Sequence, residues 1–440
     1  MTAFHRLLWS YWQTRRLQSR LQRANRAALE AHQRHQIARF TQRVLMRSPY
    51  FRPFASKPMQ DWPLMDKATM MANFDAMNTA GLRLDDVLAC ARRAEQSRDF
   101  RPMVGAHSVG LSSGTSGGRG VFVVSPAERA QWAGILLAKL LPRGLLHGER
   151  VALFLRANNN LYTAVRNPWL TFSFFDLFAP FDSHRAPLDA LRPTIIVGPA
   201  QVLRALALEK LAGRLSIAPA QVLSGAEVLE PMDRVLLEQA FGNVGEVYQA
   251  TEGFLGATCS HGTLHLNEAH VHIEPQWLDE RRFVPIVTDF TRSTQPIVRY
   301  RLDDILIRRD PALPPCPCRN PAMAIERIEG RCDDTLMLPA RDRGTITLFA
   351  DVCSRALAQV LPLRADYRLV QTDARTLALS ISPTDADVAQ ACRAHLAEIF
   401  MRQGVDMTRV TWHPAPQDMS ADFTAKRRRI VRLPFKETAR

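Results

Sequence analysis

Residues 112–120 carry the strongest local signal in the chain. They read Ser-Ser-Gly-Thr-Ser-Gly-Gly-Arg-Gly and run into the apolar segment 121–124. Glycines let the backbone turn N–H groups towards an anion, hydroxyls add donors, and a guanidinium suits phosphate. The segment lacks the Gly-Lys-Ser/Thr ending of a Walker loop and the Gly-x-Gly-x-x-Gly of a dinucleotide fold. It therefore predicts a phosphate-binding loop of another kind.

A second group of residues has the chemistry of a metal site. Five residues separate Cys259 from His265, and one residue separates Cys316 from Cys318 in a loop with two prolines before it. Three thiolates and one imidazole suit tetrahedral zinc, and four protein ligands leave no open position for catalysis. We therefore expect a structural zinc site, with His261 as a competing ligand. The alternative is two reduced thiols on a proline-rich loop beside an unrelated histidine.

Four further motifs follow the glycine-rich segment. They are Ser224-Gly225-Ala226-Glu227, Tyr248-Gln249-Ala250-Thr251-Glu252, Arg299-Tyr300-Arg301-Leu302-Asp303-Asp304 and Gly330-Arg331-Cys332-Asp333-Asp334. Together with residues 112–120 they resemble, in the same order, the motifs of the adenylate-forming superfamily, which contains the acyl-CoA synthetases. The resemblance covers about residues 50–440. The short N-terminal half and the Arg-Tyr-Arg form resemble the branch of phenylacetate–CoA ligases and of the synthetase that adenylylates the deazaflavin coenzyme F.

The resemblance implies that these motifs bind ATP. The residues expected to hold its β- and γ-phosphates are Ser112, Ser113, Gly114, Thr115, Ser116, Gly117 and Arg119. The residues expected around its adenine and ribose are Gly225, Ala226, Glu227, Tyr248, Asp304 and Arg331.

The resemblance also implies the catalytic groups. Thr251 is expected to contact the α-phosphate, and Glu252 to bind Mg²⁺, which prefers oxygen ligands. The family carries a lysine on its small C-terminal domain, and Lys426 stands at that place in a chain with only six lysines. A compact ammonium is not interchangeable with a guanidinium. Asp333 marks the family's hinge, and some relatives have a structural zinc with the cysteine and histidine spacing described above.

Three departures from the family pattern bear on the substrate. Gln249 replaces a glycine, which predicts a smaller acyl pocket or a polar contact to the substrate. The loop has no Pro-Lys, so either Arg119 takes the place of the lysine or the loop acts at an altered rate. Residues 335–344 lack the Gly-Val-Asn turn that helps form the pantetheine tunnel of CoA ligases in this branch. The sequence thus supports adenylation more strongly than transfer to CoA.

These residues predict an ATP-dependent ligase that activates a carboxylic acid as an acyl adenylate and releases pyrophosphate. An aromatic acid is favoured because the branch is rich in aryl acids, and the acceptor is expected to be CoA or the thiol of an acyl carrier protein. Two alternatives remain. One is adenylyl transfer to the phenolic hydroxyl of a cofactor-like substrate. The other is a degenerate, non-catalytic member that binds nucleotide.

The elements that position these residues alternate between strand and helix from about residue 109 to 310. The expected strands are 121–124, 151–155, 194–197 and 222–223, and a helix is expected at 127–141. This alternation predicts an α/β fold. The resemblance implies a large multi-layer N-terminal adenylation domain and a small α+β C-terminal lid.

We expect three parts: a basic helical arm over 1–50, an adenylation domain over 51–330 and a lid domain over 331–440. In the last part, residues 367–381 predict two strands, and residues 385–403 predict a helix capped by Thr384.

Charge is concentrated in the N-terminal arm. The net charge is +14, and residues 1–50 hold ten arginines but one acid, Glu30. This distribution is typical of a basic arm on an enzyme body and argues against a nucleic-acid-binding domain. The arm is expected either to pack on the body or to make a weak contact with an anionic membrane surface.

Composition also excludes several classes of protein. No run approaches the roughly 20 apolar residues of a membrane span. Seven cysteines argue against a secreted disulfide framework, and arginines interrupt the apolar residues near Met1. We therefore expect a cytoplasmic enzyme. The sequence does not determine the oligomeric state, although the resemblance admits a homodimer because dimers are common in the branch.

Overall fold

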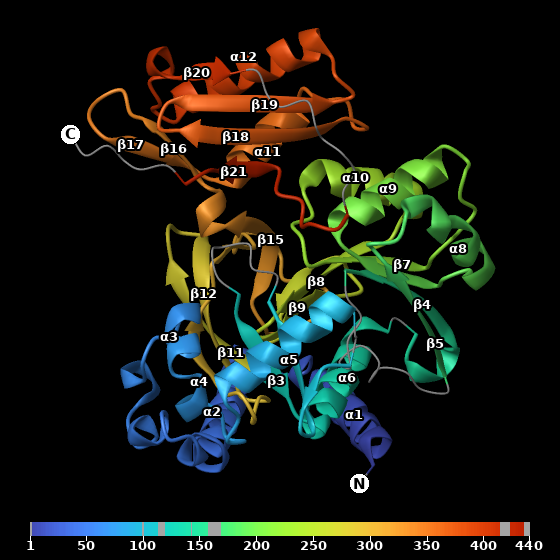
Figure 1. The fold of residues 1–440 in the computed structure, drawn as a ribbon, viewed down its shortest axis with the longest axis vertical. Helices are drawn as coiled ribbons and strands as arrows, with labels where there is room; N and C mark the ends of the chain where they lie inside the picture. Colours follow the sequence, from blue (N-terminus) through green and yellow to red (C-terminus); the bar gives the residue numbers. More distant parts are fainter. Residues whose placement is uncertain are drawn as a thin grey trace.

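The computed structural model describes residues 2–98, 101–112, 119–141, 143–156, 169–413 and 423–434. Of Asp333 it describes the backbone alone. Five of the predicted phosphate-loop residues lie outside the described residues: Ser113, Gly114, Thr115, Ser116 and Gly117. A smaller C-terminal unit sits on a large α/β body (Figure 1), so the predicted fold class is confirmed.

A mixed sheet of twelve strands forms the centre of the body, in the order β11-β12-β14-β15-β10-β9-β8-β7-β6-β4-β5, with β13 beside β12. The strands of its parallel part are β4 (Glu149–Leu155), β5 (Leu170–Asp176), β6 (Ile195–Gly198), β7 (Gln221–Gly225) and β8 (Val244–Ala250). The strands of its antiparallel part are β9 (Gly253–Thr258), β10 (Leu264–Leu266), β11 (Val271–Trp277), β12 (Arg282–Asp289), β13 (Ile297–Arg301), β14 (Asp304–Arg308) and β15 (Ala324–Arg331).

The predicted strand–helix alternation up to residue 310 is therefore wrong beyond β8. Residues 253–331 contain strands and no α-helix. The physical reason is the change from parallel to antiparallel pairing, because antiparallel neighbours need only a short turn whereas parallel neighbours need a crossover.

Alternate residues of the parallel strands enter two separate cores. Ile196 and Val222 pack against helices on one face of the sheet. Their neighbours Ile195 and Leu223 pack against helices on the other face. Side chains alternate along a strand, so both faces of these apolar strands are covered. The helices are α8 (Arg185–Leu191), α9 (Ala200–Leu211) and α10 (Pro231–Phe241) on the first face, and α1 (Ala3–Leu21) and α6 (Pro126–Leu140) on the second.

The basic N-terminal arm packs on the body. Leu7 and Tyr11 of α1 are buried against α6. Gly134 permits this contact, because a Cβ added there would lie 2.5 Å from the carbonyl oxygen of Leu7. Helix α2 (Arg26–Arg43) is attached by Gln33, whose amide donates to the carbonyl oxygen of Glu268 at 2.9 Å. Among the described residues, no helix combines the length and apolar character needed to cross a bilayer.

A small antiparallel sheet positions the end of the glycine-rich segment. It consists of β1 (Met103–Val104), β2 (His107–Leu111) and β3 (Val121–Val124), and it is accompanied by α3 (Lys67–Ala72), α4 (Phe74–Met77) and α5 (Leu84–Ser97). The backbone N–H of Ser112 donates to the carbonyl oxygen of Gly120 at 2.8 Å, so the two described ends of the segment are held together.

The C-terminal unit has a core of its own. Its elements are the hairpin β16 (Leu336–Pro339)–β17 (Thr345–Leu348), the strands β18 (Asp366–Asp373), β19 (Thr376–Ser382), β20 (Thr411–His413) and β21 (Ile430–Arg432), and the helices α11 (Ala350–Ala358) and α12 (Ala386–Arg402). Met232 of α10 joins this core and links the unit to the body. The predicted N-cap of α12 is wrong, because Asp385 rather than Thr384 accepts from the backbone N–H of Val388, at 3.0 Å.

Candidate active site

A cleft of about 1020 Å³ lies between the body and the C-terminal unit. The predicted site residues that line it are Ser112, Arg119, Ala226, Glu227, Tyr248, Thr251, Glu252, Asp304, Arg331 and Lys426. Gly225 lines an adjoining cavity. The fold thus brings residues from five separate motifs and the C-terminal unit to one place.

A tyrosine on β8 and an aspartate on β14 meet in the cleft. The hydroxyl of Tyr248 donates to Oδ2 of Asp304 at 2.7 Å. Burial raises the pKa of Tyr248 well above its ordinary value, and Asp304 raises it further, so the phenol is neutral and donates. Burial also raises the pKa of Asp304, whereas Tyr248, Arg331 and Lys426 lower it.

Thr251 and Glu252 lie in the turn between β8 and β9. The turn needs Gly253, because a Cβ there would lie 2.7 Å from Oδ2 of Asp289. Burial raises the pKa of Glu252, while a hydrogen bond with Tyr300 and the charge of Lys67 lower it. A nearby cation stabilises the ionised form of a buried carboxylate whose charge is poorly compensated. Glu252 therefore fits the role of a metal ligand.

Lys426 enters the cleft from the C-terminal unit. Burial lowers its pKa, and the neighbouring carboxylates of Asp304 and Glu227 raise it. The carbonyl oxygen of Ala425 accepts from the side-chain amide of Gln201 at 2.8 Å, which fixes the backbone just before the lysine.

The carboxylate of Glu227 holds this lysine segment. It accepts from Arg156 at 2.7 Å, from the amide of Gln201 at 3.1 Å and from the backbone N–H of Arg427 at 3.3 Å. The carboxylate that the sequence analysis assigned to the adenine side is thus used in positioning Lys426. The backbone of Ala226 beside it has φ 66°, a left-handed conformation that is unusual for a residue with a side chain.

Arg331 joins the cleft to the start of the C-terminal unit. Its guanidinium donates to Oδ2 of Asp303 at 2.9 Å. The next residues form a 3₁₀ turn, Cys332–Asp334, where Nε of Arg428 donates to Oδ1 of Asp334 at 2.6 Å.

Arg119 and Lys67 carry the positive charge near the glycine-rich segment. The guanidinium of Arg119 forms two hydrogen bonds with Glu95 of α5, at 2.5 and 2.8 Å, so its charge is already paired. Lys67, the first residue of α3, is close enough to Glu252 to lower its pKa. A Cβ placed on Gly120 would lie 3.7 Å from Cγ of Lys67. Lys67 is not among the residues predicted from the sequence, although lysine is rare in this chain.

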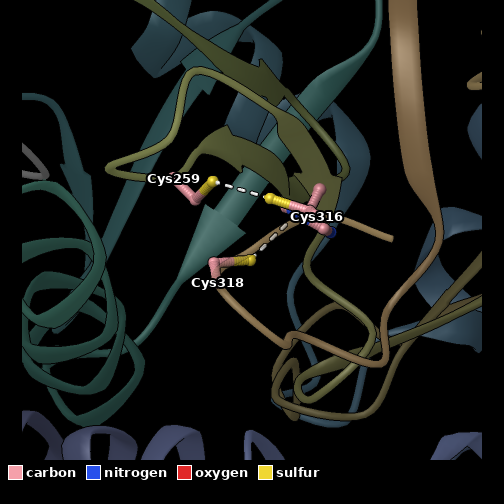
Figure 2. A group of neighbouring side chains, drawn as sticks. Cys259, Cys316 and Cys318 are labelled. Carbon is pink, nitrogen blue, oxygen red and sulfur yellow. Dashed lines mark hydrogen bonds between the residues drawn. The ribbon is translucent and has the colours of Figure 1, made fainter. Parts of the chain in front are cut away.

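The four predicted zinc ligands converge between the β9–β10 turn and the loop before β15. One donor atom from each of Cys259, His265, Cys316 and Cys318 lies within 4.8 Å of the others, and Figure 2 shows the three thiols pointing toward one another. Sγ of Cys259 is 3.6 Å from Sγ of Cys316, too far for a disulfide and close to the roughly 3.8 Å edge of a tetrahedron with 2.3 Å zinc–sulfur bonds.

A neighbouring carbonyl orients the histidine of this cluster. Nδ1 of His265 lies 3.2 Å from the carbonyl oxygen of Ala322, which directs Nε2 toward Sγ of Cys318 at 3.3 Å. The competing histidine, His261, is exposed and reaches the cluster only through its backbone N–H. The donor set therefore fits zinc.

Solved structures of other proteins share the fold of this chain. No protein-family profile and no curated protein matches the sequence. A 2-hydroxyisobutyryl-CoA ligase in complex with 2-HIB-AMP in the postadenylation state matches with a TM-score of 0.69 and 16% identity, over 92% of this chain and 89% of that one. The chain has the fold of adenylate-forming ligases. The amide bond synthetase McbA from Marinactinospora thermotolerans matches with a TM-score of 0.52 and 11% identity, over 72% and 67%.

The complex of the same 2-hydroxyisobutyryl-CoA ligase with 2-HIB-AMP and CoA in the thioesterification state matches with a TM-score of 0.54 and 16% identity, over 92% of this chain and 89% of that one.

Gln249 lines a cavity of about 1050 Å³ beside the cleft. Its side chain is held at the wall, where its Oε1 accepts from Nε1 of Trp132 at 3.3 Å and its amide donates to the carbonyl oxygen of Ala250 at 3.1 Å.

Proposed function

We propose that this protein is an ATP-dependent ligase that converts a carboxylic acid into an acyl adenylate. A carboxylate oxygen attacks the α-phosphorus of ATP, the bond from that phosphorus to the oxygen bridging to the β-phosphate breaks, and pyrophosphate leaves. The observation that carries the proposal is the meeting of Lys426, Asp304 and Glu252 in one cleft.

Each group has a role that its chemistry suits. Lys426 offsets the negative charge that builds up as the carboxylate approaches the α-phosphate, where Thr251 donates a hydrogen bond. Asp304, held by Tyr248, accepts hydrogen bonds from the ribose hydroxyls. Glu252 would hold Mg²⁺, which when bound neutralises phosphate charge. Lys67 supplies charge to the outer phosphates beside Gly120.

The acceptor in the second step is proposed to be a thiol, of CoA or of a carrier protein. Two solved complexes of the similar ligase contain CoA, which supports this choice. The zinc cluster is proposed to be structural, because its four protein ligands complete a tetrahedron and tie the β9–β10 turn to the loop before β15.

Pyrophosphate release from ATP and Mg²⁺ tests the proposal, with aryl acids, fatty acids and phenols as candidate substrates. Release that depends on an acid and is lost in Glu252→Ala supports it. Release that depends on a phenol identifies adenylyl transfer to a hydroxyl instead. Binding of ATP without release by any compound identifies a non-catalytic nucleotide-binding protein.

A further inference from the structure

A long apolar cavity extends from the cleft between α6 and the central sheet. It contains Thr251 and Lys426 at the cleft, and its volume is about 1050 Å³. Aliphatic side chains from α6 and from all five parallel strands line one part of it, among them Ile135, Leu140, Val151, Leu170, Val197 and Leu223. Charged side chains, among them Glu95, Arg98, Glu128 and Arg292, line another part. The cavity is therefore continuous with the place where the carboxylate would react.

The cavity is elongated along α6. Trp132, which contacts Gln249 beside the cleft, and Leu140 both line it and are eight positions apart on this helix. At 1.5 Å per residue they are about 12 Å apart. With carbon–carbon bonds of about 1.5 Å, an extended chain of about ten carbons covers this length.

A small aryl acid does not match this space. Cavities of roughly 300–1,000 Å³ hold whole drug-sized ligands, so a single ring at the cleft would leave the aliphatic end empty. Each methylene that enters such a wall gains about fourfold in affinity. An aliphatic tail gains affinity along the whole length of the cavity, whereas a ring gains affinity only at the end of the cavity near the cleft.

We propose that this cavity holds the aliphatic tail of the substrate, and that the acid is a fatty acid of medium chain length rather than the aryl acid expected from the sequence. This inference rests on the proposed adenylation. It assigns the carboxylate to Lys426 and Thr251 and the end of the tail to the region of Leu140.

The test is a series of straight-chain acids from acetate to hexadecanoate, compared with phenylacetate, in ATP–pyrophosphate exchange. We expect kcat/KM to rise about two- to fourfold per added methylene up to about ten carbons. Val197→Phe narrows the cavity and should shift the optimum to shorter acids, and Val151→Phe serves if the first variant does not fold. Leu146→Phe, at a position 66% exposed and outside the cavity wall, is the matched control. A flat profile, or an optimum that Val197→Phe does not move, overturns the inference.

Direct binding measurements test the cavity assignment independently of the adenylation proposal. Binding of dodecanoate and acetate is measured by calorimetry without ATP. If no acid supports exchange, the adenylation proposal fails. The cavity assignment is still supported in that case if dodecanoate binds tightly and Val197→Phe weakens its binding. Equal binding of dodecanoate and acetate overturns the cavity assignment whatever the exchange assay gives.

A second inference comes from the outer face of α1, which is independent of the cleft. Trp9 is 58% exposed and Trp12 is 53% exposed, and together with Leu8 they line a shallow groove. The helix lies at the opposite end of the molecule from the C-terminal unit (Figure 1). Exposed tryptophans at one helix face mark an interaction surface.

Charge indicates the partner for this surface. Arg6, Arg15, Arg16, Arg20 and Arg23 lie on or just after α1, no acidic residue precedes Glu30, and within the described ranges none of these five guanidiniums forms an ion pair. Tryptophans beside unpaired arginines suit the boundary of an anionic bilayer, where each basic residue adds about 1 kcal/mol of attraction.

We propose that α1 docks the protein on anionic membrane surfaces. Sedimentation with vesicles of phosphatidylcholine alone, and of phosphatidylcholine mixed with phosphatidylglycerol, tests this. We expect at least tenfold tighter binding to the anionic vesicles and its loss in Trp9→Ser/Trp12→Ser. Trp277→Ser, at a tryptophan 43% exposed on β11, is the control. Failure to bind anionic vesicles, or equal loss in the control variant, overturns the inference.

Discussion

Arg429 of the C-terminal unit forms two hydrogen bonds with the carboxylate of Asp233 on α10, at 2.9 and 3.0 Å, and both side chains are almost completely buried. Asp233 also accepts from Arg204 at 3.0 Å and from Arg427 at 2.7 Å. Arg204 in turn donates to the carbonyl oxygen of Ala365 at 3.0 Å. One carboxylate of the body thus holds residues 427–429, which lie between Lys426 and β21, and this fixes the C-terminal unit over the cleft.

Removing the charge of Asp233 should destabilise the protein strongly. Asp233→Asn leaves three arginines without their shared counter-ion, and breaking a buried pair costs about 3–5 kcal/mol. The free energy of unfolding, measured by urea denaturation, should fall by about that amount. Glu238→Gln changes an exposed acid on the same helix, 3.8 Å from Arg234, and should change it by less than about 0.5 kcal/mol. A similar fall in the free energy of unfolding in both variants would contradict the conclusion that Asp233 holds the C-terminal unit on the body.

Acid should lower the stability of the protein through Asp366, which pairs with Arg427 and Arg429, two of the arginines that contact Asp233. Burial raises the pKa of Asp366, but Arg429 and Arg427 outweigh it and lower the pKa to about 2. An unfolded aspartate titrates near 3.9, so the unfolded chain binds more protons between about pH 4 and about pH 2. The stabilisation is complete above this window and is lost as the pH falls through it, by about 2–3 kcal/mol. Urea midpoints across the window should fall more steeply for the wild type than for Asp366→Asn, and parallel slopes would refute the assignment.

Sequence patterns predicted two strands of the body well because they are bounded apolar runs. The predicted strand 121–124 has the same bounds as β3. The predicted strand 151–155 corresponds to β4, which begins two residues earlier. Those two include Glu149, which is buried and paired with Arg143 at 2.9 Å, and no local pattern distinguishes a buried paired acid from an exposed one. The same limit explains the cap of α12, where Thr384 and Asp385 are both good capping residues.

Motif order predicted which residues line the cleft, but not what each side chain contacts. Tyr248 and Asp304 are 56 residues apart and both line the cleft, but their hydrogen bond is seen only in the structure. The use of Glu227 to hold the Lys426 segment depends on contacts across the two parts of the chain. The proximity of Lys67 to Gly120 depends in the same way on the packing of α3 beside the small sheet.

Lys426 should act in adenylation and hardly at all in transfer. Lys426→Ala removes the ammonium from the cleft, and loss of one such transition-state contact slows a reaction by about 10²–10³-fold. Single-turnover formation of acyl adenylate should slow by this factor, while transfer from chemically supplied acyl adenylate should change little. Lys426→Arg should not restore adenylation because a planar guanidinium does not replace a compact ammonium. Lys57→Ala, at an exposed lysine, is the control, and equal slowing of both steps by Lys426→Ala would refute the role.

The cysteine cluster should hold one zinc ion per chain. Elemental analysis of the purified protein should find it, and His265→Ala should lose it because the imidazole supplies the fourth ligand. His261→Ala is the matched control, since that side chain is exposed and outside the cluster. Chelation should lower the Tm of the wild type and leave that of His265→Ala unchanged, because bound metal stabilises only the form that binds it. Equal zinc in the two variants would rule out His265 as a ligand.

Lys67, rather than Arg119, should be the main cation for the outer phosphates of ATP. Arg119 is engaged by Glu95 through two hydrogen bonds, whereas Lys67 lies beside Gly120 and near Glu252. Lys67→Ala should lower kcat/KM for ATP by about 10–100-fold, the effect of about 1.4–2.7 kcal/mol of lost transition-state binding. Arg119→Ala should lower it by less than about fivefold, because the arginine must first leave its partner to reach phosphate. Glu95→Gln releases Arg119, so this variant alone should bind ATP more tightly than the wild type. Combined with Arg119→Ala, the same change should raise the affinity for ATP only slightly.

A larger loss of kcat/KM in Arg119→Ala than in Lys67→Ala would reverse the two roles and restore Arg119 as the substitute for the loop lysine.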